Sequence, residues 1–528
     1  MRGDHSGTTY KGDSMRRWAT LIFFLLVGAS RAADPPVLTA RLSRPDRQLE
    51  RLIALFEGAK ANDPAAALAA WKRANHDPQA AYPKSVEAVI ALLNPGMVRE
   101  LRTLDGAELV LIPDPAGVRW SAIVPEDDGT FAALATAMAL SGGGPEPPIG
   151  AATIDRLGPP GSAQIAQAGA AVVVSARRDD LEAALGRLPL PPLDAPCGLR
   201  IQLDPEALGG SGPLPRRRVA EALRALGYTG IRGDAGLDGE TLAIIVQGRH
   251  AGPPIAPKPL DPSWLDWVPS DGRVVAAVGV ANDPTPAAWD ALLAAADRVE
   301  KVDPARAEYA PIRTRLGILA LAAGVRPEAD LWPHLLGLTA FATAEPTGTI
   351  DGGFLALHMD TEPAAARIAD RLLPRLAVSA RLVPRDAPAE PDGTRPLGRL
   401  SGRPLRVARR GATVGISWGD GVLASALAAH DRPGQSAGAA IRSAWPARPP
   451  QRAGALWPGH LPGIAAESPP KAGLRESLPI LWWGDSDDVT SRDEVRWSGL
   501  KGVVRRTLDR LPMDPPPDRA GLIAPKSR

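Results

Sequence analysis

The chain has 528 residues, of which 45% are hydrophobic and 23% are charged. This composition is typical of a globular protein, and the length exceeds that of one ordinary core, so we expect at least two packing units. The 61 basic and 59 acidic residues nearly balance, and no basic run alternates with aromatic residues, which excludes the electrostatic footprint of a nucleic-acid-binding protein. Cys197 is the only cysteine, so an intramolecular disulfide and a thiolate zinc site are excluded.

The N-terminal segment has the three parts of a secretory signal peptide. Two arginines precede an apolar run at 18–28, and Ser30-Arg31-Ala32 follows with the small residues of a cleavage site. We therefore predict a signal peptide at 15–32 and an exported protein, located in the periplasm, in the cell envelope or outside the cell. Residues 1–14 have no place in such a peptide and are interpreted as a start-site artefact. No later stretch approaches 18 consecutive apolar residues, so we expect no membrane span after the signal peptide.

The periodicity of apolar residues and the positions of proline and glycine divide the rest of the chain. Helical spacing follows the signal peptide, and alternating strand-like and helix-like patterns come after it. A proline-rich stretch separates two regions of alternating strand-like and helix-like patterns. The last segment is rich in Pro, Gly and Trp, and it ends in a strand-like and a helix-like pattern. The expected order is a helical N-terminal region (40–95), a first α+β lobe (96–250), a linker (251–262), a second α+β lobe (263–430), a C-terminal region (431–512) and a disordered tail (513–528).

An internal repeat links the two lobes. The segments "QIAQAGAAVVVSARRDDLEAAL" at 164–185 and "RVARRGATVGISWGDGVLASAL" at 406–427 agree at eight of 22 positions without a gap, and Ser175 aligns with Ser417. Each is preceded by a strand-like run, an acidic turn and an amphipathic helix. The sequence therefore predicts an α+β fold with two related lobes, built from repeated strand–helix–strand–strand–helix units that resemble a ferredoxin-like arrangement.

The run "GISWG" around Ser417 resembles the nucleophile elbow of a serine hydrolase, with His430 or His460 downstream as the base. The repeat argues against this interpretation, because Ser175 occupies the same place without flanking glycines. The strand before Ser417 is also expected to be the second arm of an antiparallel hairpin, whereas an elbow follows a strand of a parallel sheet. We therefore interpret Ser417 as a structural strand residue, and we assign no catalytic residue.

Two pairs of residues have a spacing that suits part of a metal site. His358 and Asp360 lie two apart on a predicted strand, and Asp330 and His334 lie one helical turn apart around a proline. Neither pair has an evident third ligand. Two glycine clusters, "SGGGP" at 141–145 and "GGSGP" at 209–213, lack the lysine of a phosphate loop. We assign no metal-binding residue, no cofactor-binding residue and no cofactor.

Trp482-Trp483, with Trp457 and Trp497 nearby, is the main concentration of aromatic residues. Aromatic faces suit a sugar or an apolar partner, so a binding platform is one interpretation. The other, which we favour, is that these residues cap the core of the second lobe.

The segment "PEADLWPHLLGLTAFATA" at 327–344, the strand-like run from Gly353 and the helix-like "EPAAARIADRLLP" carry a resemblance to a known family. Over residues 260–430 the chain resembles uncharacterised exported proteins of planctomycete-type bacteria. The resemblance implies export and a repeated α+β architecture, and it implies no catalytic residues.

These observations predict an exported, non-catalytic protein that binds a ligand or is associated with the cell envelope. Its partner is expected to be a protein or an envelope component, and the ligand and the oligomeric state stay open. Two alternatives remain: a serine hydrolase that uses Ser417, and an assembly factor tethered to the membrane by an uncleaved segment at 15–32.

Overall fold

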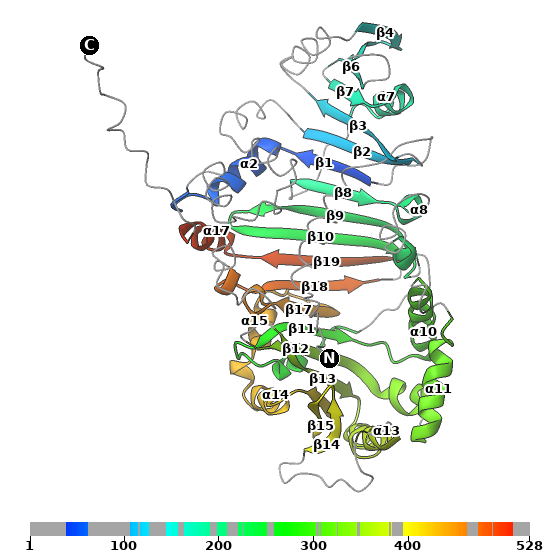
Figure 1. Ribbon diagram of the computed structural model, residues 1–528, viewed down its shortest axis with the longest axis vertical. Helices are drawn as coiled ribbons and strands as arrows, with labels where there is room; N and C mark the ends of the chain where they lie inside the picture. The colour runs from blue at the N-terminus through cyan, green and yellow to red at the C-terminus, as the bar shows by residue number, and fades with distance from the viewer. Residues whose placement is uncertain are drawn as a thin grey trace, which may run out of the picture.

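The computed structural model describes residues 38–61, 106–114, 117–125, 144–156, 163–169, 171–190, 198–208, 220–224, 226–250, 258–302, 306, 308–324, 326–345, 349–379, 382, 394–461, 474–487 and 489–510. Within this part of the chain, the fold is α+β, as predicted: one antiparallel sheet of 19 strands with helices packed against it (Figure 1). The predicted start-site segment, signal peptide and C-terminal tail lie outside the described residues.

The strands of the first part of the chain are β1 (Leu38–Ser43), β2 (Gly106–Asp114), β3 (Gly117–Pro125), β4 (Gly144–Ile149), β5 (Ala152–Arg156), β6 (Gln164–Ala168), β7 (Ala171–Ser175), β8 (Leu199–Leu203), β9 (Tyr228–Asp238) and β10 (Thr241–His250). Those of the second part are β11 (Val274–Ala281), β12 (Leu335–Ala344), β13 (Ile350–Met359), β14 (Arg395–Leu400), β15 (Arg403–Arg410), β16 (Thr413–Trp418), β17 (Arg452–Leu456), β18 (Ile480–Ser486) and β19 (Thr490–Trp497).

The α-helices are α2 (Pro45–Ala54), α7 (Arg178–Leu185), α8 (Pro205–Leu208), α10 (Pro286–Lys301), α11 (Ile312–Ala323), α12 (Glu362–Arg367), α13 (Leu373–Ser379), α14 (Val422–Asp431), α15 (Ala437–Ser443) and α17 (Leu500–Asp509). Short 3-10 or π turns are η2 (Pro262–Trp267), η3 (Pro327–Leu331), η4 (Trp332–His334), η5 (Ile368–Leu372), η6 (Pro433–Gln435) and η7 (Pro458–His460).

The strand pairings run in one line across the molecule. From edge to edge the order is β4–β5–β6–β7–β3–β2–β1–β8–β9–β10–β19–β18–β17–β11–β12–β13–β16–β15–β14, and every pairing is antiparallel. Strands from before residue 251 form one half and those after residue 273 form the other, and they meet at β10 and β19 (Figure 1). Outward from this pair, the strand order follows the same series in both directions. Two strands that directly precede the paired strand in sequence come first (β9 and β8, or β18 and β17). An earlier strand follows (β1 or β11), and then the two strands that come after it in sequence (β2 and β3, or β12 and β13).

The predicted C-terminal region (431–512) does not form a separate unit. It supplies β17, β18 and β19, three strands rather than the expected single strand, and they lie in the middle of the sheet. Likewise the N-terminal region expected to be helical from residue 40 begins with β1, which lies between β2 and β8. Sequence periodicity missed these placements because it reports local patterns, whereas the order of strands depends on contacts between distant segments.

The described end of the predicted linker also packs against the sheet. The amide of Leu260 donates to the carbonyl of Pro450 at 2.8 Å, and the Leu260 side chain is only 1% exposed. Residues 251–257 lie outside the described part. The segment from Lys258 is therefore part of the second half and not a free connection.

In the second half, the strand order matches the predicted ferredoxin-like arrangement only in part. β13 and β15 lie on either side of β16, with α12, η5 and α13 in the connection, as a split strand–helix–strand unit requires. In a ferredoxin-like unit the strand after the second helix returns beside the first strand. Here β12, which precedes β13, occupies that place, and after α14 the chain continues to β17 beside β11.

The apolar cores lie on either side of β8, β9 and β10, and the larger one extends as far as β17 and β18. Phe354 and Ala356 of β13 pack with Leu423 and Ala426 of α14, and a second cluster forms around α12 and η5. At the other end, Leu181 of α7 packs with residues of β3 and β7. None of these three clusters includes a described residue of β8, β9 or β10. On these middle strands, polar side chains gather on one face.

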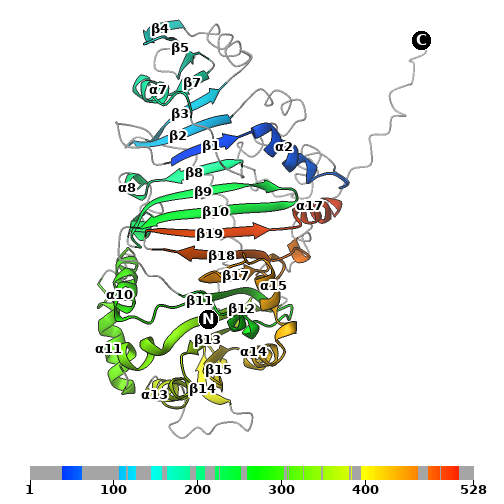
Figure 2. The same cartoon turned by 180° about the vertical axis from the view of Figure 1, so that it is seen from behind.

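The start and the end of the described chain contact each other beside the middle strands. Helices α2 and α17 lie near the same ends of these strands in both views (Figures 1 and 2). Lys501 Nζ lies 3.1 Å from Glu57 Oε2, and the amide of Lys60 donates to Asp509 Oδ1 at 2.8 Å. These contacts join the two halves a second time, outside the sheet.

Candidate ligand-binding site

Ser417 lies within the regular strand β16, where it is paired with Phe354 of β13 and Arg406 of β15. Its side chain is 1% exposed, and its Oγ has no hydrogen-bond partner. An elbow nucleophile has a strained backbone and an accessible hydroxyl. Among the described residues that are not glycine, only Arg44 and Ser401 have a positive φ. Ser417 therefore lacks the geometry of an elbow.

The two histidines proposed as partners of Ser417 have other contacts. The His430 ring stacks on Trp267 with centroids 4.3 Å apart, and its Nδ1 has no hydrogen-bond partner. His460 Nδ1 lies 2.6 Å from the carbonyl oxygen of Val274. Neither imidazole is hydrogen-bonded to the serine, so the structure brings no serine–histidine pair together at this position.

Ser417 and Ser175 provide a matched test of the structural interpretation. Ser175 Oγ donates to the carbonyl of Trp120 at 3.1 Å, whereas Ser417 Oγ is buried without a partner. We expect Ser175→Ala to lower the free energy of unfolding by about 1 kcal/mol, and Ser417→Ala to leave it unchanged or raise it slightly. Denaturant unfolding of both variants measures this. A fluorophosphonate probe that labels Ser417 in the folded protein would contradict the interpretation.

The residues considered as metal ligands are in two different places. His358 Nε2 and Nδ1 lie 3.0 Å and 3.1 Å from the hydroxyls of Thr339 and Thr413, and its ring stacks on Trp264. Asp360 is instead 3.0 Å from Nδ1 of His334. Asp330, the other member of the second pair, accepts a hydrogen bond from the amide of Arg326. The part of the chain that the structure describes has no group of three or more His, Cys, Asp or Glu residues placed to hold a metal ion.

Burial and, to a smaller extent, the charge of His430 lower the pKa of His358 from 6.5 to about 3. An unfolded chain binds a proton at this residue near its ordinary pKa, whereas the folded protein does not until the pH approaches 3. The contribution of His358 to the free energy of unfolding is therefore complete above pH 6.5. Below that pH it is lost by up to about 1.4 kcal/mol per pH unit.

We expect the NMR resonance of the His358 ring to stay at its neutral position from pH 8 down to pH 5. The variant His358→Gln identifies the peak by its absence. A titration midpoint near 6.5 for this peak in the folded protein would contradict the burial of a neutral imidazole.

The tryptophans near the C-terminus do not form one platform. Trp482 and Trp483 are adjacent on β18, so their side chains point to opposite faces of the sheet. Trp483 is 7% exposed and belongs to the core around α14, and Trp457 packs against the same core. Of the four tryptophans, Trp483 is thus a core residue and Trp457 packs against that core, so the favoured interpretation holds for these two.

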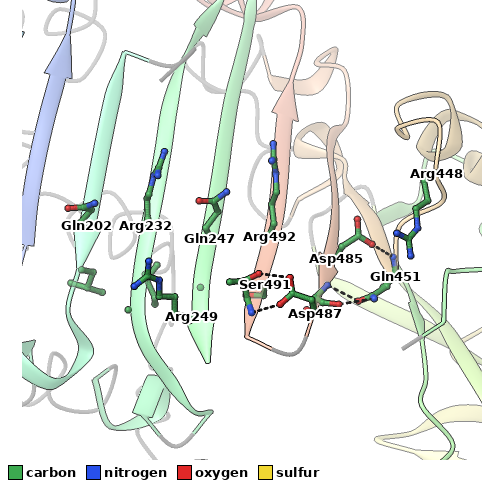
Figure 3. A pocket seen from close by; sticks show the side chains of 16 residues that line it. Gln202, Arg232, Gln247, Arg249, Arg448, Gln451, Asp485, Asp487, Ser491 and Arg492 are labelled. Atoms are coloured by element: carbon green, nitrogen blue, oxygen red, sulfur yellow. Dashed lines mark hydrogen bonds between the residues drawn. The ribbon is translucent and has the colours of Figure 1, made fainter. Parts of the chain in front are cut away.

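A cavity of about 750 Å³ lies at the middle of the sheet (Figure 3). Side chains from β8, β9, β10, β18 and β19 line it, together with residues just before β17. We call it the central pocket. Its polar side chains are Gln202, Arg232, Gln247, Arg249, Arg448, Gln451, Asp485, Ser486, Asp487, Thr490, Ser491 and Arg492. Both halves of the chain contribute to it, and its volume is within the range of small-molecule sites.

The strand register explains why polar side chains converge here. Residues directly opposite each other on neighbouring strands point to the same face. Five such positions form one row across five strands: Gln202, Arg232, Gln247, Arg492 and Asp485. The strands carry these residues at separations of up to about three hundred positions in the sequence, so only the assembled sheet forms the row.

The arginines of the central pocket differ in how far they are neutralised. Arg232 is paired with Asp234, with Nη2 2.8 Å from Oδ2. Arg492 lies 3.9 Å from Glu494, at the limit of an ion pair, and Glu494 is closer to Arg496. Among the described residues, Arg249 and Arg448 have no ion pair or side-chain hydrogen bond.

The carboxylates are largely engaged by hydrogen bonds from the chain. Asp487 accepts from the amides of Val489 and Thr490, and these bonds lower its pKa below 3.8. Asp485 accepts from the amide of Gln451 at 3.0 Å. Burial raises the pKa of Asp234, but the hydrogen bonds and charges of its two arginine partners outweigh burial, so its pKa is lowered. The pocket lining has four arginines and two aspartates.

Sequence reasoning missed this site. The signal that was present is weak: polar residues occupy alternate positions at the end of β10 (Gln247, Arg249) and along β19 (Thr490, Arg492, Glu494). No local motif marks the residues, because each strand supplies only one or two of them.

No family model and no curated protein matches the chain. Among solved structures, crystal form I of TP0453 matches with 7% identity and a TM-score of 0.22, over 42% of this chain and 78% of that one. A similarity at this level carries no argument about fold or function. None of the described helices has the length and apolar character needed to span a membrane.

Proposed function

We propose that the protein is an exported, non-catalytic binding protein, and that it holds its ligand in the central pocket. The observation that carries the proposal is the convergence of polar side chains from both halves of the chain on one cavity of about 750 Å³. Concave sites with a few convergent polar groups are where proteins bind small ligands. The burial of Ser417 and the contact of His460 with the carbonyl of Val274 favour binding over the hydrolase alternative.

The proposal of export rests on the sequence at 15–32, with its two arginines, apolar run and cleavage pattern. The resemblance to exported proteins of planctomycete-type bacteria agrees with it. A periplasmic or envelope location would give a protein of this kind access to small solutes and to envelope components.

We also infer that the two halves arose by duplication of one strand–helix unit. The alignment of Ser175 with Ser417 supports this inference, and so does the matching series of strands outward from β10 and β19. Ser175 is the last residue of β7, and Ser417 is the last but one of β16. Each of these strands pairs with the second strand of a hairpin: Ser175 is opposite Ser121 of β3, and Ser417 is opposite Phe354 of β13. A binding site at the junction of two related units would then be a consequence of joining them.

Native mass spectrometry of protein purified gently from a periplasmic extract tests the proposal. We expect an additional bound mass in the wild type, and a chain mass that corresponds to a start at Ala33. Gln247 is at the centre of the polar row, so Gln247→Trp should fill the pocket and remove the bound mass.

The matched control is Arg399→Trp, at an exposed position of the edge strand β14 far from the pocket in the strand order. This variant should keep the bound mass. A bound mass that Gln247→Trp retains would contradict the pocket as the site, and a chain that keeps residues 15–32 would favour the tethered alternative over release.

A further inference from the structure

The central pocket has arginines that are unpaired or only weakly paired at two places among the described residues. Arg492 is opposite Gln247 across the β10–β19 pair, and Arg249 is two residues beyond Gln247 on the same face. Neighbouring strands are about 4.8 Å apart and alternate residues about 6.7 Å apart, so the Cα atoms of these two arginines are about 8 Å apart. Arginine side chains are long enough to converge on one anion over that distance, and their planar groups suit phosphate and carboxylate.

The second place is Arg448, which lies across the pocket from the first two arginines. Figure 3 shows Asp485 and Gln451 between Arg448 and the strand that carries Arg492. Arg448 is exposed and comes from the segment between α15 and β17. A single small anion cannot satisfy both places, because the carboxylate of Asp485 lies between them.

Asp485 favours a hydrogen-bond donor in the middle of a ligand. Its carboxylate receives one hydrogen bond, from the amide of Gln451, which leaves acceptor positions open toward the cavity. An anionic group placed there would be repelled, whereas a hydroxyl or an ammonium group would donate to it. Gln202 and Gln247 add neutral groups that can both donate and accept on the other side.

We propose that the central pocket binds a small molecule with an oxyanion, phosphate or carboxylate, at each end and a hydroxyl or ammonium donor between them. The proposal rests on the proposed binding function and names the ligand class. One oxyanion binds Arg249 and Arg492, the other binds Arg448, and the donor binds Asp485. A soluble bisphosphate and a lipid headgroup with two phosphates around a hydroxyl share this chemistry.

Isothermal titration calorimetry with fructose 1,6-bisphosphate, fructose 6-phosphate and fructose tests the soluble form, and flotation with cardiolipin vesicles tests the lipid form. We expect the bisphosphate or cardiolipin to bind, the monophosphate to bind at least about tenfold more weakly than the bisphosphate, and fructose not to bind. Binding should weaken as the salt concentration rises.

Variants locate the two anion positions. Arg448→Gln and Arg492→Gln should each weaken binding of the bound ligand about tenfold or more, because each removes charge-assisted hydrogen bonds to one oxyanion. Arg399→Gln is the matched control: an exposed strand arginine, outside the pocket and without a side-chain partner among the described residues. It should bind as the wild type does.

The remaining outcomes distinguish a failure of the ligand class from a failure of the binding function. Cardiolipin binding without bisphosphate binding supports the ligand chemistry and assigns its source to a lipid. Equal loss in all three variants, or equal binding of fructose, overturns the ligand class. If neither probe binds while native mass spectrometry finds a neutral ligand in the pocket, the ligand class fails and the binding function stands. If no probe binds and no bound mass is found, both fail.

Discussion

The pairing of β10 with β19 is the interaction on which the rest of the structure depends. Eight consecutive residue pairs, from Leu242 with Trp497 to Arg249 with Thr490, connect strands that are about 250 residues apart in the sequence. Without this pairing, the two halves would each end in an open sheet edge, and open edges carry unpaired backbone groups that promote association. The same pairing places Gln247 opposite Arg492, so one contact both unites the sheet and completes the pocket.

Close packing on the neighbouring strand supports this arrangement. A Cβ atom at Gly484 would lie 2.0 Å from Oδ1 of Asp493, and Asp493 is held by Arg452 at 2.7 Å. Glycine therefore allows the ion pair to lie flat against β18. The outer edges of the sheet are protected in another way: β4 contains three prolines, and β14 contains Pro396 and an irregularity at Gly398. The sheet is thus continuous in the middle, and its two edge strands are poorly suited to pair with a further strand.

The distribution of apolar and polar residues explains why the candidate site is in the middle. At both ends, helices cover the sheet and bury side chains such as Ile123 and Phe354. In the middle strands, arginines and carboxylates take the positions that face the helices elsewhere, and hydrogen bonds from backbone amides hold the carboxylates of Asp485 and Asp487. The pocket thus forms where this polar surface meets the loop residues Arg448, Gln451 and Asp487.

The sequence allowed the local features to be predicted, and the structure explains where that prediction stopped. The α+β class followed from alternating periodicities, and the strand position of Ser417 followed from its alignment with Ser175. The central position of the C-terminal strands could not be predicted, because nothing local distinguishes a strand that extends an edge from one that joins two halves. The pocket was missed for the same reason: Gln202, Arg232 and Arg492 are brought together only by the register of distant strands.

Disulfide formation between β10 and β19 tests the joined sheet most directly. Ile244 and Val495 are directly opposed, whereas Ile244 and Glu494 point to opposite faces. In a Cys197→Ser background, the pair Ile244→Cys and Val495→Cys should form a disulfide under mild oxidation, and the pair Ile244→Cys and Glu494→Cys should not. Efficient crosslinking of the second pair, or of neither, would contradict the register that unites the two halves and forms the pocket.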